Sequence, residues 1–374
     1  MTLRVRPVSV EAVSDFLSRR DDAAHQQWPS WGLVKSEWQH ALIGWFDGDE
    51  IVGTGLVLSR RLRPTPWSFD YLPEGPVIDW DRYAASDVIE PLVQHLRQSG
   101  SAVVKIGARL PLRRWSGQTL MTSMTQSPSR WRDVTPDIDY ATVQELHDSL
   151  RALGARPYEA PGAGFGGTMQ PRYGVEVPLL GRTIADLRAA SSPSFLRNVK
   201  KAERAGISVR IGDIEDIGRF HSMLVQSGER DGFTPRGEEY FVRMISAMNA
   251  EDPKRVGIYL AEHGGETTAA ALRVTVGDIS SYTYGGSSPA GHVERASNAL
   301  QWRMLTDALE DGCSVHDLRG VSDTLDPKDP LWGLTRFKLA MGGEAVEYSG
   351  EWDIAIRPMV ARALSVYLSR RLQT

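Results

Sequence analysis

The sequence of 374 residues contains one cysteine, Cys313, so a disulfide within the chain is excluded. A single cysteine is typical of proteins in reducing compartments. No stretch approaches the roughly 18 consecutive apolar residues of a membrane helix. No apolar segment of a signal peptide follows the opening residues MTLRVRPVSV. We therefore expect a cytoplasmic protein.

An excess of positive charge is also missing. The formal net charge is −4, which argues against a protein that coats nucleic acid by bulk electrostatics. Any polyanion that the chain binds must therefore be met by local basic clusters. Hydrophobic residues make up 41% and charged residues 24%, the balance of a globular protein, and the length suits two domains.

Most familiar catalytic signatures are absent. The sequence contains no GxSxG, HExxH, Walker A, CxxC or paired His/Cys metal spacing, so we expect neither metal chemistry nor nucleophilic catalysis. His316 lies in a predicted buried strand, where a structural role is favoured. The glycine-rich stretch APGAGFGG, residues 160–167, is followed by the extended TMQPRYGVEVPL and not by a helix. A linker or substrate loop is therefore favoured over a phosphate loop.

Hydrophobic periodicity predicts a mixed α/β protein. Helices are expected at residues 8–19, 87–98, 143–153, 193–205, 215–227, 237–249 and 293–311. Strands are expected at residues 41–46, 51–58, 102–108, 207–211, 257–262, 269–276, 280–286 and 314–320. Residues 111–136 are polar, without a clear period, and are predicted to form a long surface loop. The order helix, helix, strands, helix, strand in both halves hints at a duplicated fold.

The helix predicted at residues 193–205 carries a basic face. Ser192 and Pro193 are typical of a helix start, and Gly206 is typical of a helix end. Four basic residues follow one another at i, i+3, i+4 and i+7 and so share one face: Arg197, Lys200, Lys201 and Arg204. This face is either a solvated surface or an anion-binding site.

The segment LTRFKLAMGG places Arg336 and Lys338 on either side of Phe337, with apolar neighbours and a Gly-Gly turn behind them. Lys338 could face solvent, as most lysines do. The apolar flanks favour the alternative, a lysine that is partly desolvated and directed into a cleft.

An ordered set of segments resembles the FemABX peptidyltransferases, which build the interpeptide bridge of peptidoglycan. The segments are QQWPSWGLVKSEW, YLPEGPVIDW, RNVKKAERAGISV, SYTYGGSS, the later LQW, DLRGV and FKLAMGGEAVEYSGEWD. They run from about residue 27 to residue 356. The resemblance implies an α/β (α+β) fold of two GNAT-like, that is acetyltransferase-like, subdomains with a cleft between them. Residues 1–180 plus 355–374 would form the first, acceptor-side subdomain, and residues 181–354 the second.

The resemblance also implies an activity. The enzyme would be an aminoacyltransferase that takes its donor amino acid from aminoacyl-tRNA and needs no further cofactor. The acceptor would be a stem-peptide amine of UDP-MurNAc-pentapeptide or lipid II. We expect a monomer with peripheral contact to the inner membrane face. The helical coiled-coil arm of some relatives is not expected, because nothing between Gly206 and Tyr259 has that pattern.

Site residues carry over from the family one by one. Lys35 and Arg236 match residues that contact phosphate, and Lys338 matches the lysine associated with transfer. Thr234 and Tyr240 match the spacing around the arginine. Tyr284, or alternatively Tyr282, matches an acceptor-site tyrosine. Candidate contacts to an anion or to tRNA are Arg197, Lys200, Lys201, Arg204 and Arg336, and Glu229 and Asp231 are candidate proton acceptors.

The sequence argues against two other functions and leaves a third open. An acyl-CoA-dependent N-acyltransferase of the same fold would need a pyrophosphate loop that opens a helix, and neither half contains one. A non-catalytic nucleic-acid-binding module disagrees with the net charge and with the lack of an aromatic-basic RNA motif. A tRNA-dependent enzyme that modifies a peptide or nucleoside natural product stays open.

Overall fold

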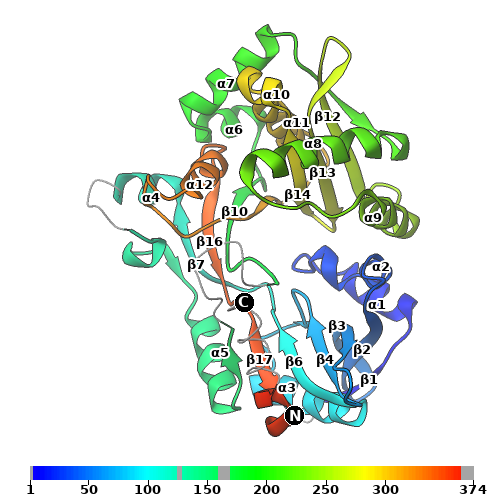
Figure 1. Ribbon diagram of the computed structural model, residues 1–374. Helices are drawn as coiled ribbons and strands as arrows, with labels where there is room; N and C mark the ends of the chain where they lie inside the picture. The colour runs from blue at the N-terminus through cyan, green and yellow to red at the C-terminus, as the bar shows by residue number, and fades with distance from the viewer. Residues whose placement is uncertain (1–2, 124–128, 159–168, 364–374) are drawn as a thin grey trace.

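The computed structural model describes residues 3–123, 129–158 and 169–363. Two mixed β-sheets form two lobes, each with its own helices (Figure 1). The glycine-rich stretch at residues 160–167 lies outside the described residues. None of the helices in the described part of the chain is both long and apolar enough to cross a membrane.

The first sheet has eight strands in the order β1-β2-β3-β4-β6-β17-β9, and β5 pairs with β3. The strands are β1 (Arg4–Pro7), β2 (Gln39–Asp47), β3 (Glu50–Arg61), β4 (Ser68–Leu72), β5 (Val77–Ile78), β6 (Ser101–Ile106), β9 (Arg156–Pro157) and β17 (Trp352–Ala355). Its helices are α1 (Val10–Leu17), the 3-10 turn η1 (His25–Gln27), α2 (Pro29–Val34), α3 (Ala85–Gln98) and α5 (Ala141–Ala152).

The second sheet has nine strands in the order β11-β12-β13-β14-β15-β10-β16-β7-β8. The strands are β7 (Pro111–Ser116), β8 (Ile138–Asp139), β10 (Tyr173–Pro178), β11 (Ser208–Gly212), β12 (Val256–His263), β13 (Glu266–Val276), β14 (Ile279–Ser287), β15 (Val315–Gly320) and β16 (Glu344–Tyr348). The helices and 3-10 turns are α4 (Gly117–Ser123), η3 (Trp131–Asp133), α6 (Ile184–Ala190), α7 (Pro193–Arg204), η4 (Ile214–Asp216), α8 (Ile217–Asp231), α9 (Glu238–Glu251), α10 (Pro289–Glu294), α11 (Ala296–Glu310) and α12 (Trp332–Leu339).

The two halves repeat one order of elements. A strand (β1 or β11) is followed by two helices (α1–α2 or α8–α9), three antiparallel strands (β2-β3-β4 or β12-β13-β14), a helical crossover and a final strand (β6 or β15). In both halves this final strand pairs in parallel with the third antiparallel strand, as the crossover allows. The duplicated order that the sequence hinted at is confirmed.

The sheets do not follow the boundary expected at residue 180. Strands β7, β8 and β10 all precede it, yet they pair in the second sheet beside β15 and β16. The division into residues 1–180 plus 355–374 and residues 181–354 stays a prediction.

The prediction of a long surface loop at residues 111–136 is wrong. Strand β7 pairs with β16, and α4 and η3 follow it. Trp115 and Trp131 are fully buried, with ring centroids 5.9 Å apart. The polar residues of the segment were misleading because Arg113 forms an ion pair with Glu347 on the paired strand β16, and Arg114 forms one with Glu176 on β10, the next strand.

The helix predicted at residues 193–205 is confirmed as α7, with the Ser192 side chain accepting a hydrogen bond from the Phe195 amide.

The prediction of a single helix at residues 293–311 is wrong. The segment is divided into α10 and α11 at Arg295, whose φ of 67° lies in the left-handed region. Left-handed backbone usually calls for glycine, so the sequence gives no sign of this break.

One apolar core joins the two lobes. It includes Trp28, which caps the start of α2, Trp31 within α2, and Phe220 and Phe241 from α8 and α9. Helices α2 and α9 lie against each other (Figure 1), and the Ser30 hydroxyl donates to the Glu251 carboxylate over 2.6 Å. Residues 206–259 form β11, η4, α8, α9 and the start of β12, and α8 packs on β13 and β14. The described residues of this segment therefore contain no coiled-coil arm.

Candidate active site

Lys35 lies where α2 ends, as its C-terminal cap. Its Nζ donates a hydrogen bond to the Tyr240 hydroxyl over 3.3 Å. The same Nζ lies 4.8 Å from the centroid of the Trp31 ring and 5.1 Å from that of the Tyr240 ring. Burial, and next the positive charge of Arg236, lower the pKa of Lys35 to about 8. A cation held among ring faces in this way is oriented without being neutralised.

Arg236 and Tyr284 complete this group, which we call the Lys35 cluster (Lys35, Arg236, Tyr240 and Tyr284). The Arg236 guanidinium lies 4.7 Å from the centroid of the Tyr240 ring, and the hydroxyls of Tyr240 and Tyr284 are 3.4 Å apart. Arg236 is exposed, as is Thr234 two residues before it. The structure thus brings together four of the five residues expected to bind the acceptor, from separate parts of the chain.

Lys338 is buried in α12, with 4% of its surface exposed. Its Nζ donates to the backbone carbonyl of Gly320 over 2.8 Å and lies 5.7 Å from the centroid of the Tyr282 ring. Burial lowers its pKa to about 7, although the carboxylate of Asp317 works in the opposite direction. The expectation that this lysine is desolvated agrees with its position.

The two groups lie on opposite faces of the second sheet. Tyr284 packs into the core that holds Phe220 and Phe241 of α8 and α9. Tyr282, on the same strand, packs instead beside Phe195 and Phe337 of α7 and α12. Tyr282 and Tyr284, the alternatives for the acceptor-site tyrosine, therefore lie on opposite faces of the sheet. The structure does not bring Lys338 into contact with the Lys35 cluster.

The basic residues of α7 are all exposed, as is Arg336 on α12. The two helices are neighbours, since the ring centroids of Phe195 and Phe337 are 6.4 Å apart. Arg336 is thus an exposed cation on a helix that packs against α7. The candidate proton acceptors are exposed at the end of α8, where Asp231 forms an ion pair with Arg230 over 2.8 Å.

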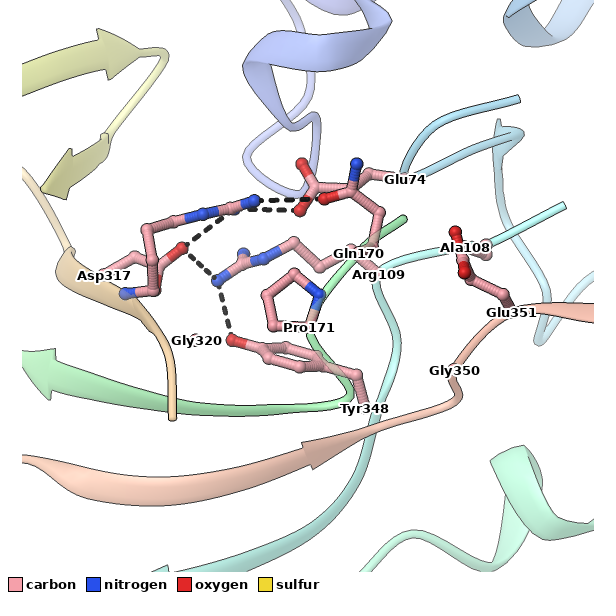
Figure 2. Close-up of a pocket in the computed structure, with 12 residues that line it drawn as sticks. Glu74, Ala108, Arg109, Gln170, Pro171, Asp317, Gly320, Tyr348, Gly350 and Glu351 are labelled. Atoms are coloured by element: carbon pink, nitrogen blue, oxygen red, sulfur yellow. Dashed lines mark hydrogen bonds and ion pairs between the residues drawn. The ribbon is translucent and has the colours of Figure 1, made fainter. Parts of the chain in front are cut away.

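A buried ionic network that the sequence did not predict joins the two sheets (Figure 2). Arg109, which follows β6, donates to Asp317 over 3.1 Å, to the Tyr348 hydroxyl over 2.8 Å and to Glu176. Burial disfavours the charge on Asp317, yet Arg109 and Arg319 outweigh it and hold the pKa of this carboxyl below its usual value. Removing one partner of such a network typically costs about 3–5 kcal/mol of stability.

Arg319 extends the network to the first sheet. Its Nη1 lies 2.8 Å from Glu74 Oε1 and 3.2 Å from Asp317 Oδ2, and its Nη2 donates to the Gln170 side chain over 3.3 Å. A pocket with about 380 Å³ of empty space, partly open to solvent, is lined by these residues together with Gly320 and others (Figure 2). Because Lys338 contacts Gly320, this pocket borders the Lys338 site.

A second pocket of about 230 Å³ shares Arg109, Asp317 and Arg319 with the first. It is also lined by His25, whose ring lies 5.1 Å from that of Trp31, the ring beside Lys35. The two pockets are thus neighbours, one bordering the Lys338 site and the other lined by a residue that contacts Trp31. The sequence contained one signal for these residues, since Asp317 and Arg319 lie in the family-like segment DLRGV and Glu74 lies in the family-like segment YLPEGPV.

The family model described as the FemAB family matches residues 8–263 and 254–368. The chain belongs to the FemAB family. It is 26% identical over 363 residues to a UDP-N-acetylmuramoylpentapeptide-lysine N(6)-alanyltransferase of Weissella viridescens, with 95% of this chain and 96% of that protein covered. A lipid II:glycine glycyltransferase of Staphylococcus saprophyticus is 21% identical, with 94% and 96% covered. The family and these relatives make this chain an aminoacyltransferase.

Solved structures agree on the fold. The crystal structure of FemX superposes with a TM-score of 0.77 at 18% identity, covering 95% of this chain and 98% of that one. A tandem GNAT protein from the clavulanic acid biosynthesis pathway gives a TM-score of 0.51 at 11% identity, with 95% and 98% covered. The expected pair of GNAT-like subdomains is confirmed. Among the described residues, no group of three or more His, Cys, Asp or Glu side chains could hold a metal ion.

Proposed function

We propose that this chain transfers an amino acid from aminoacyl-tRNA to an amine in the stem peptide of a peptidoglycan precursor, either UDP-MurNAc-pentapeptide or lipid II. The names of the Weissella and Staphylococcus relatives support this choice of acceptor. We further propose that the protein works in the cytoplasm as a monomer. Contact with the inner membrane face would be peripheral and would serve a lipid-linked acceptor.

The observation that carries the proposal is the Lys35 cluster. Lys35 and Arg236, two hundred residues apart, both lie against the ring of Tyr240. Together the two cations match the two negative charges of a diphosphate. Both proposed acceptors contain a diphosphate, whereas a simple amine substrate does not. Tyr240 and Tyr284 would line the acceptor's path.

Lys338 would act on the ester that links the amino acid to the tRNA ribose. The acceptor amine attacks the ester carbonyl, so that a C–N bond forms and the C–O bond to the ribose breaks. Negative charge develops on the carbonyl oxygen, and a protonated Lys338 would stabilise it. The amine gives up a proton, and the departing ribose oxygen gains one. The ester is already activated, so positioning supplies much of the acceleration.

The opposite placement of the two sites suggests how the substrates enter. The acceptor would approach the Lys35 cluster, on the side of the second sheet where α8 and α9 pack. The donor would approach the other face, where α7 and α12 present their exposed basic residues. Two neighbouring pockets share Arg109, Asp317 and Arg319, and the reacting groups of the two substrates would meet there. The two substrates would then meet without competing for one surface.

A transfer assay tests the proposal. Purified protein is incubated with a panel of charged tRNAs and with each precursor form, and the product is identified by mass spectrometry. We expect transfer that stops when ribonuclease is added. Transfer that survives complete digestion of the tRNA, or that proceeds with acetyl-CoA alone, would contradict the proposal. A product formed only with a peptide or nucleoside antibiotic would move the acceptor outside cell-wall synthesis.

A further inference from the structure

Two glutamates of the pocket beside Lys338 have no role in the function proposed so far. Glu74 follows β4, and Glu351 lies between β16 and β17, so the two come from distant parts of the chain. Both line the pocket (Figure 2). Gly107 lies between them, because a Cβ atom built on it would be 3.3 Å from Glu351 Cγ and 4.0 Å from the Glu74 amide nitrogen.

Only one of the two carboxylate oxygens of Glu74 has a partner among the described residues. Its side chain is 5% exposed, and Oε1 pairs with Arg319, but Oε2 accepts no hydrogen bond from any described residue. Leaving a buried oxygen unpaired costs roughly 1–3 kcal/mol, and more if it is charged, so such an atom calls for an explanation. A cationic ligand that donates to Oε2 would remove this cost.

The backbone at this ion pair is also strained. Glu74 has a φ of 54° and Arg319 a φ of 60°, and these are two of the three non-glycine residues with positive φ in the described part of the chain. Such conformations persist where the surrounding structure imposes them, and they cluster at ligand-binding and active sites. Here both members of one ion pair are held this way, and both line the pocket.

Glu351 supplies a second acceptor. It is 2% exposed, Oε1 accepts from the Tyr71 hydroxyl over 2.8 Å, and Oε2 accepts from the Met169 amide over 2.9 Å. Burial raises the pKa of its carboxyl, although the positive charge of Lys105 works in the opposite direction, and a cation bound beside the carboxylate would add to the effect of Lys105. The positive groups of the pocket are already engaged, since Arg109 and Arg319 contact Asp317, Glu176 and Glu74. The pocket therefore favours a cation over an anion.

We propose that this pocket is a subsite for a primary ammonium group, held between Glu74 and Glu351. An ammonium carries three N–H donors, which suits the free Oε2 of Glu74 and the remaining lone pairs of Glu351. The identity of the amine rests on the proposed function. It is either the α-ammonium of the amino acid on the donor or the side-chain ammonium of the acceptor's stem peptide.

Small probes test the subsite without tRNA or precursor. Alanine ethyl ester carries the donor's ammonium, and Nα-acetyl-lysine amide carries the acceptor's. Binding to the full chain is followed by NMR titration, and the N-acetylated form of each probe serves as the uncharged comparison. We expect one probe to bind and its acetylated form to bind much more weakly. The probe that binds identifies which substrate amine occupies the pocket.

Glu74→Gln keeps the size of the side chain and an oxygen for Arg319, and removes the charge. We expect it to weaken binding of the ammonium probe roughly 10- to 100-fold, the usual range when a hydrogen bond to a charged group is removed. Glu351→Gln should act in the same direction, and Gly107→Ala should weaken binding by narrowing the space. Glu347→Gln is the matched control, because Glu347 is equally buried but pairs with Arg113 and Arg172 outside the pocket.

Equal binding of the ammonium and acetylated probes would overturn the subsite, as would unchanged affinity in folded Glu74→Gln and Glu351→Gln. Thermal melting establishes that each variant is folded, and if one is not, the other glutamine variant and Gly107→Ala decide. The outcome is independent of the transfer assay. If the protein transfers normally but does not bind the probes, only the subsite is overturned. If it binds a probe but transfers nothing, only the proposed function is overturned.

Discussion

Burial lowers the pKa of two lysines of this chain, but the two side chains have different surroundings. Lys35 is half-buried, keeps one side toward the exposed Arg236 and contacts aromatic rings and a hydroxyl. Lys338 is nearly inaccessible and donates to the backbone carbonyl of Gly320. The first arrangement leaves a charge available to a ligand that arrives from solvent. The second places a charge at one fixed point, where it can respond to charge that develops during a reaction.

The largest effect is expected at Lys338. Lys338→Ala should lower the rate of transfer on the order of 100- to 1000-fold, the usual result of removing one oxyanion donor. Acceptor binding should be largely unchanged, because the Lys35 cluster lies on the other face of the sheet. Single-turnover rates and thermal melts on the same preparation separate this outcome from a loss of stability. Lys328→Ala, at an exposed position, is the control, and near-normal turnover in Lys338→Ala would move the transfer site elsewhere.

The next effect is expected at the Lys35 cluster. Lys35→Glu and Arg236→Glu each replace an attractive contact with a diphosphate by a repulsive one. We expect acceptor affinity to fall roughly 10- to 100-fold in each variant, with donor affinity little changed. Calorimetric titration with the nucleotide precursor measures this. Lys254→Glu provides an exposed charge reversal away from the cluster. If both cluster variants bind the precursor like wild type, the phosphate site lies elsewhere, with α7 as the next candidate.

A smaller effect is expected on the basic face of α7. The double variant Arg197→Glu/Arg204→Glu should weaken tRNA binding at low salt and change it little at high salt. The slope of log affinity against log salt should become shallower by about one for each phosphate that the helix no longer neutralises. Filter binding across a salt series measures the slope, with Arg61→Glu/Lys254→Glu as a double charge reversal at exposed positions. An unchanged slope means that α7 does not bind tRNA.

The smallest effect concerns stability. The pKa of Lys338 is about 7 in the folded chain against an ordinary 10.5, so between these values the unfolded chain binds more protons. The free energy of unfolding should therefore rise with pH from about 7 to about 10. In Lys338→Met this rise should be smaller. The Tm of the variant relative to wild type should therefore be higher below pH 7 than at pH 10, by on the order of 1–3 °C. Parallel slopes in melts at pH 6, 8 and 10 would show that the lysine is not desolvated.

The parts of the structure that local chemistry determines were predictable. Ser192, Pro193 and Gly206 delimit α7, and Gly206 has the positive φ expected at a helix end. The position of β7 was not predictable, because its partner strand β16 lies more than two hundred residues away and carries the carboxylate that pairs with Arg113. The same reason hid the ionic network, since Arg109 and Asp317 meet only when both sheets are formed. The family motifs pointed to Lys35 and Lys338 but not to the side chains between them.

Strands β16 and β17 are consecutive along the chain, yet β16 lies in the second sheet and β17 in the first, between β6 and β9. During synthesis the first lobe therefore leaves the ribosome with the place between β6 and β9 unfilled. It stays incomplete until residues 352–355 emerge, after the whole second lobe. We expect a nascent chain arrested before residue 352 to hold an open sheet edge, which chaperones must protect until the last strand arrives.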